Sequence, residues 1–450
     1  MSRTDPRPAQ TSLKEIFQTW WPLAASWLLM ALELPFLSAV MARLADPTIN
    51  LAAYGGIVFP LALIIEAPII MLLAASTALS KDWTSYQKIR KFMNVTSGAL
   101  TLFHAAAAFT PLYYWIAGDL IGAPVEIIQP ARIGLMIMLP WTWAIAYRRF
   151  NQGVLIRFGH SRIVGKGTLV RLGADLAVLA AGYYFGQLPG IVVATSAVSA
   201  GVLSEAFYIG IKVQPVLKED LKSAPRVKPE LSRNQFLKFY IPLALTSLMT
   251  LLSQPLISSA LSRMPRPLDS LAVWPVMSGI LFLFRASGVA YNEVVVAVID
   301  QPRSYHNLRK FTALIAGCST LLMVLFAATP LSTLWFEDFS ALPLQLIPLA
   351  NTALWLGLLV PGANTLQSWY QGIIMSSRKT RGIPEAVLVF LLTTFLIYAV
   401  GIIQARSTGI YIGVLGFSLG MTFQAAWLWF RSRRPLSIIR RKDQSWQPSE

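Results

Sequence analysis

The sequence predicts an all-α integral membrane protein with about twelve transmembrane helices, arranged as two parallel six-helix repeats that form two lobes around a central cleft. Three observations predict this fold. Hydrophobic residues make up 55% of the 450 residues and charged residues only 13%, whereas soluble domains have roughly 45–50% and about 25%. Apolar segments long enough to cross a hydrocarbon core recur from Phe17 to Phe430. The second half of the chain repeats the first at a shift of about 220 residues.

Charged and turn-rich breaks divide the chain into twelve candidate spans. They lie near residues 18–42, 51–79, 92–117, 127–147, 164–187, 190–212, 236–262, 270–299, 311–335, 343–375, 384–404 and 408–430. Several exceed the roughly 20 residues that a perpendicular helix needs, so we expect tilt or proline kinks. An even number of spans places both termini on the same side of the membrane.

The distribution of Lys and Arg predicts which side that is. Assigning the termini and alternate loops to the cytoplasm collects 31 of the 38 basic residues, and basic residues in short loops mark the cytoplasmic face. The 31 include Arg3, Arg7, Arg148, Arg149, Arg303, Arg378, Lys379 and the tail Arg431–Lys442. We therefore expect both termini in the cytoplasm and the protein in a bacterial inner membrane. Contact of the tail with anionic membrane lipids stays open.

Several function classes are excluded by what the sequence lacks. One cysteine, Cys318, and three scattered histidines offer no metal-binding spacing. The chain has no glycine-rich phosphate loop of the kind that an ATP-driven pump carries. We therefore expect no metal, no cofactor and no catalytic residues. We also expect no nucleic-acid partner, because most of the chain sits in the membrane.

An internal repeat appears when the chain is compared with itself at a shift of about 220 residues. Matches include Pro22-Leu23-Ala24 with Pro242-Leu243-Ala244, Arg43 with Arg263, Asp119 with Asp338, and Gln152-Gly153 with Gln371-Gly372. Apolar sequences share Leu and Ala by chance, but not Pro, Arg and Gln-Gly at constant spacing. Because each half has six spans, both halves enter the membrane with the same orientation, which makes the repeat parallel.

The repeat predicts four parts of the chain. These are an N-terminal six-helix lobe (1–212), a cytoplasmic linker (213–235), a C-terminal six-helix lobe (236–430) and a basic cytoplasmic tail (431–450). Duplicated bundles of this kind form transporters whose substrate site lies between the halves near the midplane. The expected site is therefore the cleft between the lobes.

Short motifs in both halves carry a resemblance to a known family. Pro242-Leu243-Ala244-Leu245, followed by Gln254-Pro255 and Ser262-Arg263, resembles the start of the second half in the progressive ankylosis protein family, which has a basic residue at the position of Gln254. Ala53-Tyr54-Gly55 is similar to its second helix. That family belongs to the superfamily of multidrug and toxic compound extrusion (MATE) proteins, lipid-linked oligosaccharide flippases and polysaccharide exporters. The resemblance implies V-shaped lobes and export driven by an ion gradient or by the substrate's own gradient.

Ionisable residues at membrane depth mark the candidate substrate site, because each costs roughly 2.5–3.5 kcal/mol at a helix centre and normally faces the bundle interior or water. Glu66 and Arg285 occupy equivalent positions in the two halves. Ser278, Arg285 and Asn292 recur every seven residues and share one helix face. We expect these four residues to bind substrate. A structural ion pair within the membrane is the alternative for Arg285.

Glu33 is the candidate for ion coupling. It lies two residues before Pro35, a helix breaker that frees a backbone carbonyl for an ion or water. In MATE transporters, an acid in the first helix resembles this placement and takes part in coupling to a proton or sodium. Structural hydrogen bonding inside the lobe and exposure near the outer interface are the alternatives. Arg171 and Asp175, one helical turn apart, are expected to form a local pair.

The repeated Gln-Gly pairs suggest a gate. Gln152-Gly153 and Gln371-Gly372 are expected at the cytoplasmic ends of the fourth and tenth helices. A hinge or gate at the inner mouth is one interpretation, and helix termination by glycine before a basic loop is the other.

These observations favour a MATE-like secondary active transporter that exports a small charged organic solute by alternating access, with Arg285 attracting an anionic group. A flippase for a lipid-linked precursor is the first alternative, but it would need a larger cationic cavity than one arginine provides. A non-transporting membrane enzyme or scaffold is the second. An enzyme would need acid and base residues on facing helices, and the sequence shows no such motif.

Overall fold

A computed structural model describes residues 12–301, 304–377 and 380–445; Arg3, Arg7, Arg303, Arg378 and Lys379 lie outside them. The regular elements of these residues are all helices, as predicted. The first half contains α1 (Leu13–Ala31), α2 (Glu33–Ala42), α3 (Pro47–Ala53), η1 (Tyr54–Val58), α4 (Phe59–Glu66), α5 (Leu72–Leu79), α6 (Trp83–Phe109), α7 (Leu112–Tyr114), η2 (Trp115–Ile121), α8 (Val125–Ile137), α9 (Leu139–Arg157), α10 (Ser161–Phe185), α11 (Gly190–Val216) and η3 (Leu217–Leu221). The second contains α12 (Arg233–Leu251), α13 (Ser253–Ser262), α14 (Pro267–Val289), α15 (Tyr291–Val298), α16 (Ser304–Ala328), α17 (Leu331–Leu334), η4 (Trp335–Phe339), η5 (Leu344–Leu346), α18 (Ile347–Leu356), α19 (Val360–Ser376), α20 (Gly382–Gln404) and α21 (Gly409–Ser445).

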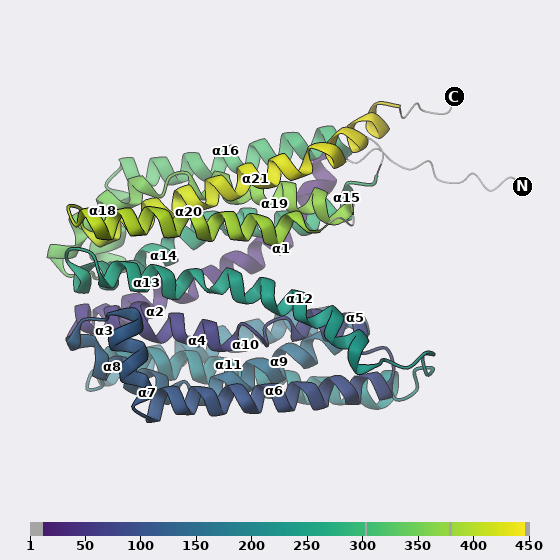
Figure 1. Ribbon diagram of the computed structural model, residues 1–450, viewed down its shortest axis with the longest axis horizontal. Coiled ribbons are helices and arrows are strands. Elements are labelled where there is room, and N and C mark those ends of the chain that lie inside the picture. Colours follow the sequence, from purple (N-terminus) through teal and green to yellow (C-terminus); the bar gives the residue numbers. More distant parts are fainter. Residues whose placement is uncertain (1–11, 302–303, 378–379, 446–450) are drawn as a thin grey trace, which may run out of the picture.

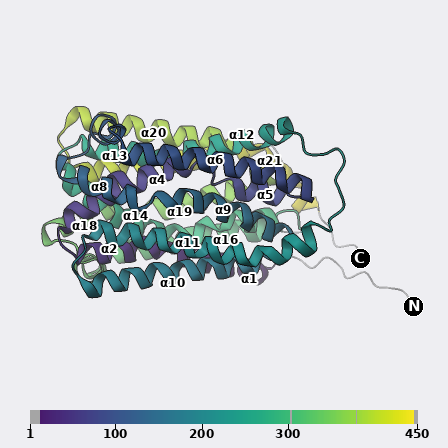
Figure 2. The same cartoon turned by 90° about the horizontal axis from the view of Figure 1, so that it is seen from below.

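The helices form two lobes, one above the other in Figure 1. Figure 2 shows that the long helices of both lobes run along the same axis. Nine helical segments of the described chain are long and apolar enough to cross a membrane, and the pair α18 and α19, bent by 40°, makes a tenth. The predicted spans 127–147 and 164–187 coincide with α8–α9 and α10, whose charged residues make them less apolar.

The backbone repeats as the sequence does. Ser12 and Ser232 each form a capping box at the start of α1 and α12, with Glu15 and Gln235 respectively. A serine hydroxyl and a carboxylate or amide that exchange hydrogen bonds in this way satisfy two free backbone N–H groups. The first helix of each half is then interrupted at an equivalent residue, Leu32, the counterpart of Leu252.

The first helical segment of each half packs on the opposite lobe. Trp20 Nε1 in α1 donates to the carbonyl of Ser287 in α14 at 2.8 Å. At the equivalent place, the Tyr240 hydroxyl in α12 donates to the carbonyl of Pro68 beside α4. Ile16 is fully buried in a core formed with helices α15, α16 and α19. The predicted lobe of residues 1–212 therefore places its first helical segment, α1, against the other half.

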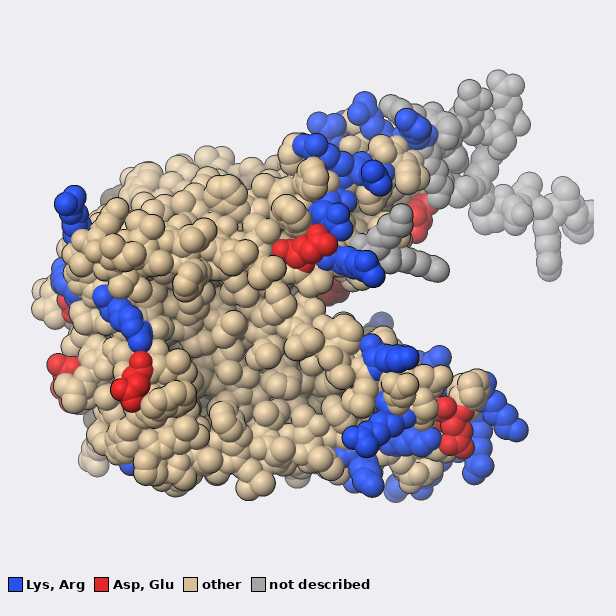
Figure 3. Space-filling model, viewed as in Figure 1, with Lys and Arg blue, Asp and Glu red and all other residues tan. Residues whose placement is uncertain are grey.

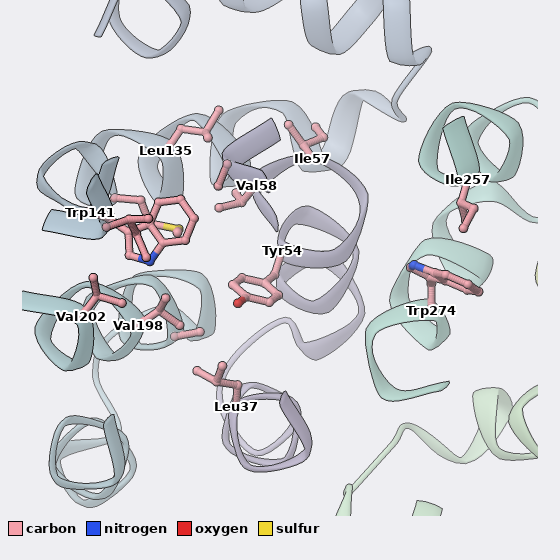
Figure 4. Packing of buried hydrophobic residues seen from close by; sticks show 14 of the residues in the cluster. Leu37, Tyr54, Ile57, Val58, Leu135, Trp141, Val198, Val202, Ile257 and Trp274 are labelled. Atoms are coloured by element: carbon pink, nitrogen blue, oxygen red, sulfur yellow. The ribbon is translucent and has the colours of Figure 1, made fainter. Parts of the chain in front are cut away.

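The two lobes share one hydrophobic core beyond these segments. Figure 4 shows Tyr54, Leu37 and Trp141 on one side of this core and Trp274 with Ile257 on the other. The lobes approach so closely that a Cβ added to Gly55 of η1 would lie 2.6 Å from a ring carbon of Pro275 in α14. Only glycine leaves room for this contact.

The molecule has a basic end and a far end. The basic end is where α1 and α12 begin and α21 finishes, and Figure 3 shows Lys and Arg gathered there on both lobes. The surface is hollowed between the lobes at this end, which makes a cleft open to the basic side. The far end holds the C-termini of α2 and α13, and there the lobes are in contact.

The linker between the lobes is tied to the basic end. The N–H groups of Val227 and Ser85 each donate to Asp82 at 2.8 Å, and Lys88 pairs with Glu230 at 3.0 Å. Burial alone would raise the pKa of Asp82, but the hydrogen bonds from Val227 and Ser85 outweigh it and hold this pKa below its usual range. The predicted linker of residues 213–235 is shorter in the structure, because α11 and η3 continue to Leu221.

Candidate functional site

A buried network of charged side chains lies inside the first lobe. Arg148 of α9 donates to Glu205 of α11, and Gln152 Nε2 donates to the other oxygen of Glu205 at 2.8 Å. Glu205 is fully buried and Arg148 is 5% exposed. The prediction that Arg148 and Arg149 lie in a cytoplasmic loop is wrong. Helix α9 continues to Arg157, because the carboxylate of Glu205 compensates the burial of Arg148.

Glu33 belongs to a second part of this network. Arg171 Nη2 of α10 donates to Glu33 Oε1 at 2.5 Å, and its Nε lies 3.8 Å from Asp175 Oδ2. The predicted pair of Arg171 and Asp175 is confirmed, and Glu33 makes a hydrogen bond inside the lobe. Asp175 is buried, and its carboxylate oxygens have no hydrogen-bond partner within the described residues. Gly201 makes room for it, since an added Cβ would lie 1.8 Å from Asp175 Oδ1.

The network holds more acids than bases. Its carboxylates are Glu33, Glu66, Asp175 and Glu205, and its guanidinium groups are Arg148, Arg149 and Arg171. One carboxylate is therefore in excess when all groups are ionised.

Among the described residues of the second lobe there is no equivalent network. At the equivalent positions this lobe carries uncharged residues, namely Ser253, Gln367, Ser368, Phe390, Thr394 and Gln424. The exception is Arg285, which stands where the first lobe has Glu66. At this one position the first lobe therefore has a carboxylate and the second a guanidinium, although their backbones repeat.

Arg285 lies among aromatic and sulfur-containing side chains of α14 and α21. Its guanidinium carbon is 5.2 Å from the ring centre of Phe282 and 5.7 Å from that of Phe417, and Nη1 is 3.8 Å from the sulfur of Met421. These neighbours, which the sequence does not mark, hold the cation through their polarisable faces. In the described part of the chain no carboxylate pairs with Arg285, so its N–H donors remain able to bind an anion.

The other candidate substrate residues have different surroundings. Ser278 and Asn292 are half-buried; Ser278 lies in α14 with Arg285, whereas Asn292 lies in α15 beyond the break at Ala290. The Ser278 hydroxyl donates to the carbonyl of Trp274 at 2.5 Å. Glu66 is buried in the first lobe, where Arg149 and Arg148 are among its charged neighbours. The structure therefore groups Glu66 with the charged network and not with Arg285.

Each Gln-Gly pair lies near the end of its helix, as predicted, but the helix continues for four residues beyond the glycine. Gly153 lies inside α9, and Gly372 lies inside α19. An added Cβ at Gly153 would lie 2.5 Å from the carbonyl oxygen of Leu73, and one at Gly372 would lie 2.6 Å from Cβ of Val295. The interpretation as helix-terminating glycines is wrong, because these residues allow α9 and α19 to pack closely on α5 and α15. Gln152 bonds Glu205 as described above, and Gln371 is half-buried beside Gly372.

Comparisons with known proteins decide the fold. No family model and no curated protein matches the sequence. A solved structure described as the inward-facing conformation of a multidrug resistance MATE family transporter of the MOP superfamily matches with a TM-score of 0.73 and 12% identity, over 96% of this chain and 99% of that chain. The chain has the MATE fold. An outward-facing conformation of a MATE family transporter gives a lower TM-score of 0.62, at 13% identity, over 97% of this chain and 100% of that chain.

The structure of a flippase is also similar to this chain. The lipid II flippase MurJ in an inward closed conformation matches with a TM-score of 0.67 and 15% identity, over 95% of this chain and 93% of that chain. These neighbours are transporters and not enzymes. The resemblance to the progressive ankylosis family stays a prediction.

Proposed function

We propose that this protein is a secondary active transporter with the MATE fold that exports a small organic anion from the cytoplasm by alternating access. The observation that carries the proposal is Arg285, a half-buried arginine at membrane depth that no carboxylate in the described chain neutralises. A buried cation without a counter-ion is costly. We expect an arginine such as Arg285 at this depth where a transported anion serves as its counter-ion.

The orientation follows from charge. The basic end holds the linker and the start of α1, and positive residues accumulate on the cytoplasmic side. We therefore assign this end to the cytoplasm, in the inner membrane of a bacterium. The open cleft then faces inward, and the solute enters it from the cytoplasm.

The surroundings of Arg285 suggest how a solute would be held. The guanidinium would bind a carboxylate or phosphate oxygen through charge-assisted hydrogen bonds. Phe282, Phe417 and Met421 would contact apolar atoms of the same solute. Ser278 of α14 and Asn292 of α15 would add polar contacts. A compact anion with an apolar part fits this site.

Ion coupling is assigned to the network of the first lobe. Glu33 and Asp175 share Arg171, which leaves one carboxylate in excess. A proton or a sodium ion would neutralise it, and its release would change how α2 and α10 pack. Gln152-Gly153 and Gln371-Gly372 would act as gating contacts where α9 and α19 meet α5 and α15. No enzymatic step is proposed.

Binding can be tested by thermal shift. The purified protein would be screened with citrate, pyrophosphate, nucleotides, lipophilic cations and lipid diphosphates. A small anion at about 100 times its Kd is expected to stabilise the protein by about 2.7 kcal/mol. Arg285→Gln is expected to lose this shift, and Arg285→Lys to keep part of it because lysine keeps the charge without the planar donors.

A matched control is Arg266→Gln, because Arg266 pairs with Asp269 at the far end. This variant should keep the anion-induced shift. Stabilisation that is equal in the protein and in Arg285→Gln would contradict the assignment of Arg285.

The flippase is the second candidate function, and the likeness to MurJ favours it. Its substrate would be a lipid-linked precursor with a phosphate group. In the same screen, stabilisation by lipid diphosphates without any response to small anions would select the flippase.

A further inference from the structure

Two arginines in equivalent places form hydrogen bonds between the lobes at the far end. Arg43 follows α2 as its C-cap residue. It donates through Nη1 to the carbonyl of Phe339 at 2.8 Å and through Nη2 to the carbonyl of Asp338, both at the end of η4 in the other lobe. The same Nη1 also donates to the carbonyl of Ala39 in its own helix at 2.8 Å. One guanidinium therefore joins the ends of two helices that belong to different lobes.

Arg263 repeats this arrangement with the lobes exchanged. It is the C-cap residue of α13 and donates to the carbonyls of Ile121, Leu120 and Asp119, at 2.6, 3.0 and 3.1 Å, at the end of η2. It also donates to the carbonyl of Ser259 in its own helix at 3.0 Å.

The backbone turns just after the carbonyl groups that accept these hydrogen bonds. Gly122 after η2 has φ +74°, and its counterpart Ala341 after η4 has φ +49°. These left-handed residues end the short helices. At Gly122 an added Cβ would lie 3.1 Å from the guanidinium carbon of Arg263, so a side chain there would press against the arginine.

The chemistry explains why arginine stands here. The last carbonyls of a helix have no partner within the helix and carry partial negative charge. A guanidinium is always protonated and offers five N–H donors in a fixed plane, so it can bind the carbonyls of two helix ends at once. Each arginine thus bonds to helix ends on both sides of the lobe interface, at the end opposite the open cleft.

We propose that Arg43 and Arg263 form a pair of latches, related by the internal repeat, that hold the far end closed while the cleft is open at the basic end. Opening of the far end then requires both arginines to leave the carbonyls of η4 and η2. This inference rests on the proposed alternating access. Because the two latches span one interface, loss of both should favour far-end opening more than loss of either.

The proposal can be tested by measuring the distance between the lobes at the far end. Spin labels would be placed at Val125 and Leu344, equivalent residues of opposite lobes that are 76% and 75% exposed, in a Cys318→Ser background in lipid nanodiscs. The expected result is a short distance with intact arginines. Each of Arg43→Gln and Arg263→Gln should raise the ratio of long to short distances about fivefold, and the double variant more, since charged hydrogen bonds exposed to water contribute modestly.

Arg132→Gln is the matched control. Arg132 also lies at the far end and donates to the carbonyls of Ala108 and Phe109, at 3.0 Å each, but within one lobe. It should leave the distances unchanged. If the double variant does not fold, the two single variants carry the test.

The outcomes separate the latch from the proposed function. Unchanged distances in the arginine variants, or an equal change in Arg132→Gln, would overturn the latch even if the protein transports anions. Longer distances in the Arg43 and Arg263 variants alone would support the latch, even if anion transport is absent and the proposed function fails.

Discussion

Replacing Glu205 by leucine is expected to lower the free energy of unfolding by about 3–5 kcal/mol, because it leaves the buried guanidinium of Arg148 without its counter-ion. Arg148 is 5% exposed, so water cannot take over the role of the carboxylate. Gln152 would lose its acceptor in the same change. The measurement is the unfolding free energy or the Tm of the purified variant.

Two further variants show whether charge is the cause. Glu230→Leu removes a carboxylate from an exposed pair with Lys88, whose side chains are 59% and 45% exposed, and should change the free energy of unfolding by less than about 1 kcal/mol. The double variant Glu205→Leu with Arg148→Met removes both buried charges and should be more stable than Glu205→Leu alone. A loss in Glu205→Leu as small as that in Glu230→Leu would contradict the buried network.

Substituting valine at Gly153 and Gly372 is expected to cost about 1–3 kcal/mol at each site by overpacking. Under the proposed gating role, transport should also fall, by more than tenfold. At Gly153 the nearest atom to an added Cβ is a backbone carbonyl, which cannot move aside as a flexible side chain can. Transport and Tm of each variant are the measurements.

The repeat supplies a matched control pair. Gly98 and Gly317 are equivalent residues inside α6 and α16, and an added Cβ meets nothing within 4 Å at either one. Alanine there should leave transport unchanged and add up to about 1 kcal/mol of stability, since glycine weakens helix interiors. Normal transport in both Gly153→Val and Gly372→Val would rule out the gating role.

The two lobes could be predicted because the residues that match between the halves are of types that two apolar sequences rarely share by chance. Equivalent prolines, arginines and Gln-Gly pairs set the six-helix period. The packing of α1 and α12 on the opposite lobes could not be predicted, since it depends on tertiary contacts. Trp20 reaches the carbonyl of Ser287 only once both halves are folded, and no local pattern indicates which lobe a helix will contact.

The sites were partly predictable for a similar reason. An ionisable residue is easy to recognise in an apolar segment, so the sequence alone was enough to select Glu33, Glu66 and Arg285 as candidates. The partners of these residues come from other helices, and neither Phe417 beside Arg285 nor Arg171 beside Glu33 could be paired in advance. Arg148 was predicted to lie in a loop because hydropathy analysis places the end of a helix at the first charged residue. It cannot show that a carboxylate from a distant part of the chain, here Glu205, compensates the charge of that residue.

The central claim, ion-coupled export of an anion, is tested most directly by flux. The anion found in the thermal-shift screen would be followed in proteoliposomes containing the protein, with a pH or sodium gradient imposed across the membrane. We predict gradient-driven movement of the anion, its loss in Arg285→Gln, and movement that no longer depends on the ion gradient in Glu33→Gln. An anion that binds at Arg285 but never crosses the membrane, whichever gradient is applied, would contradict this account.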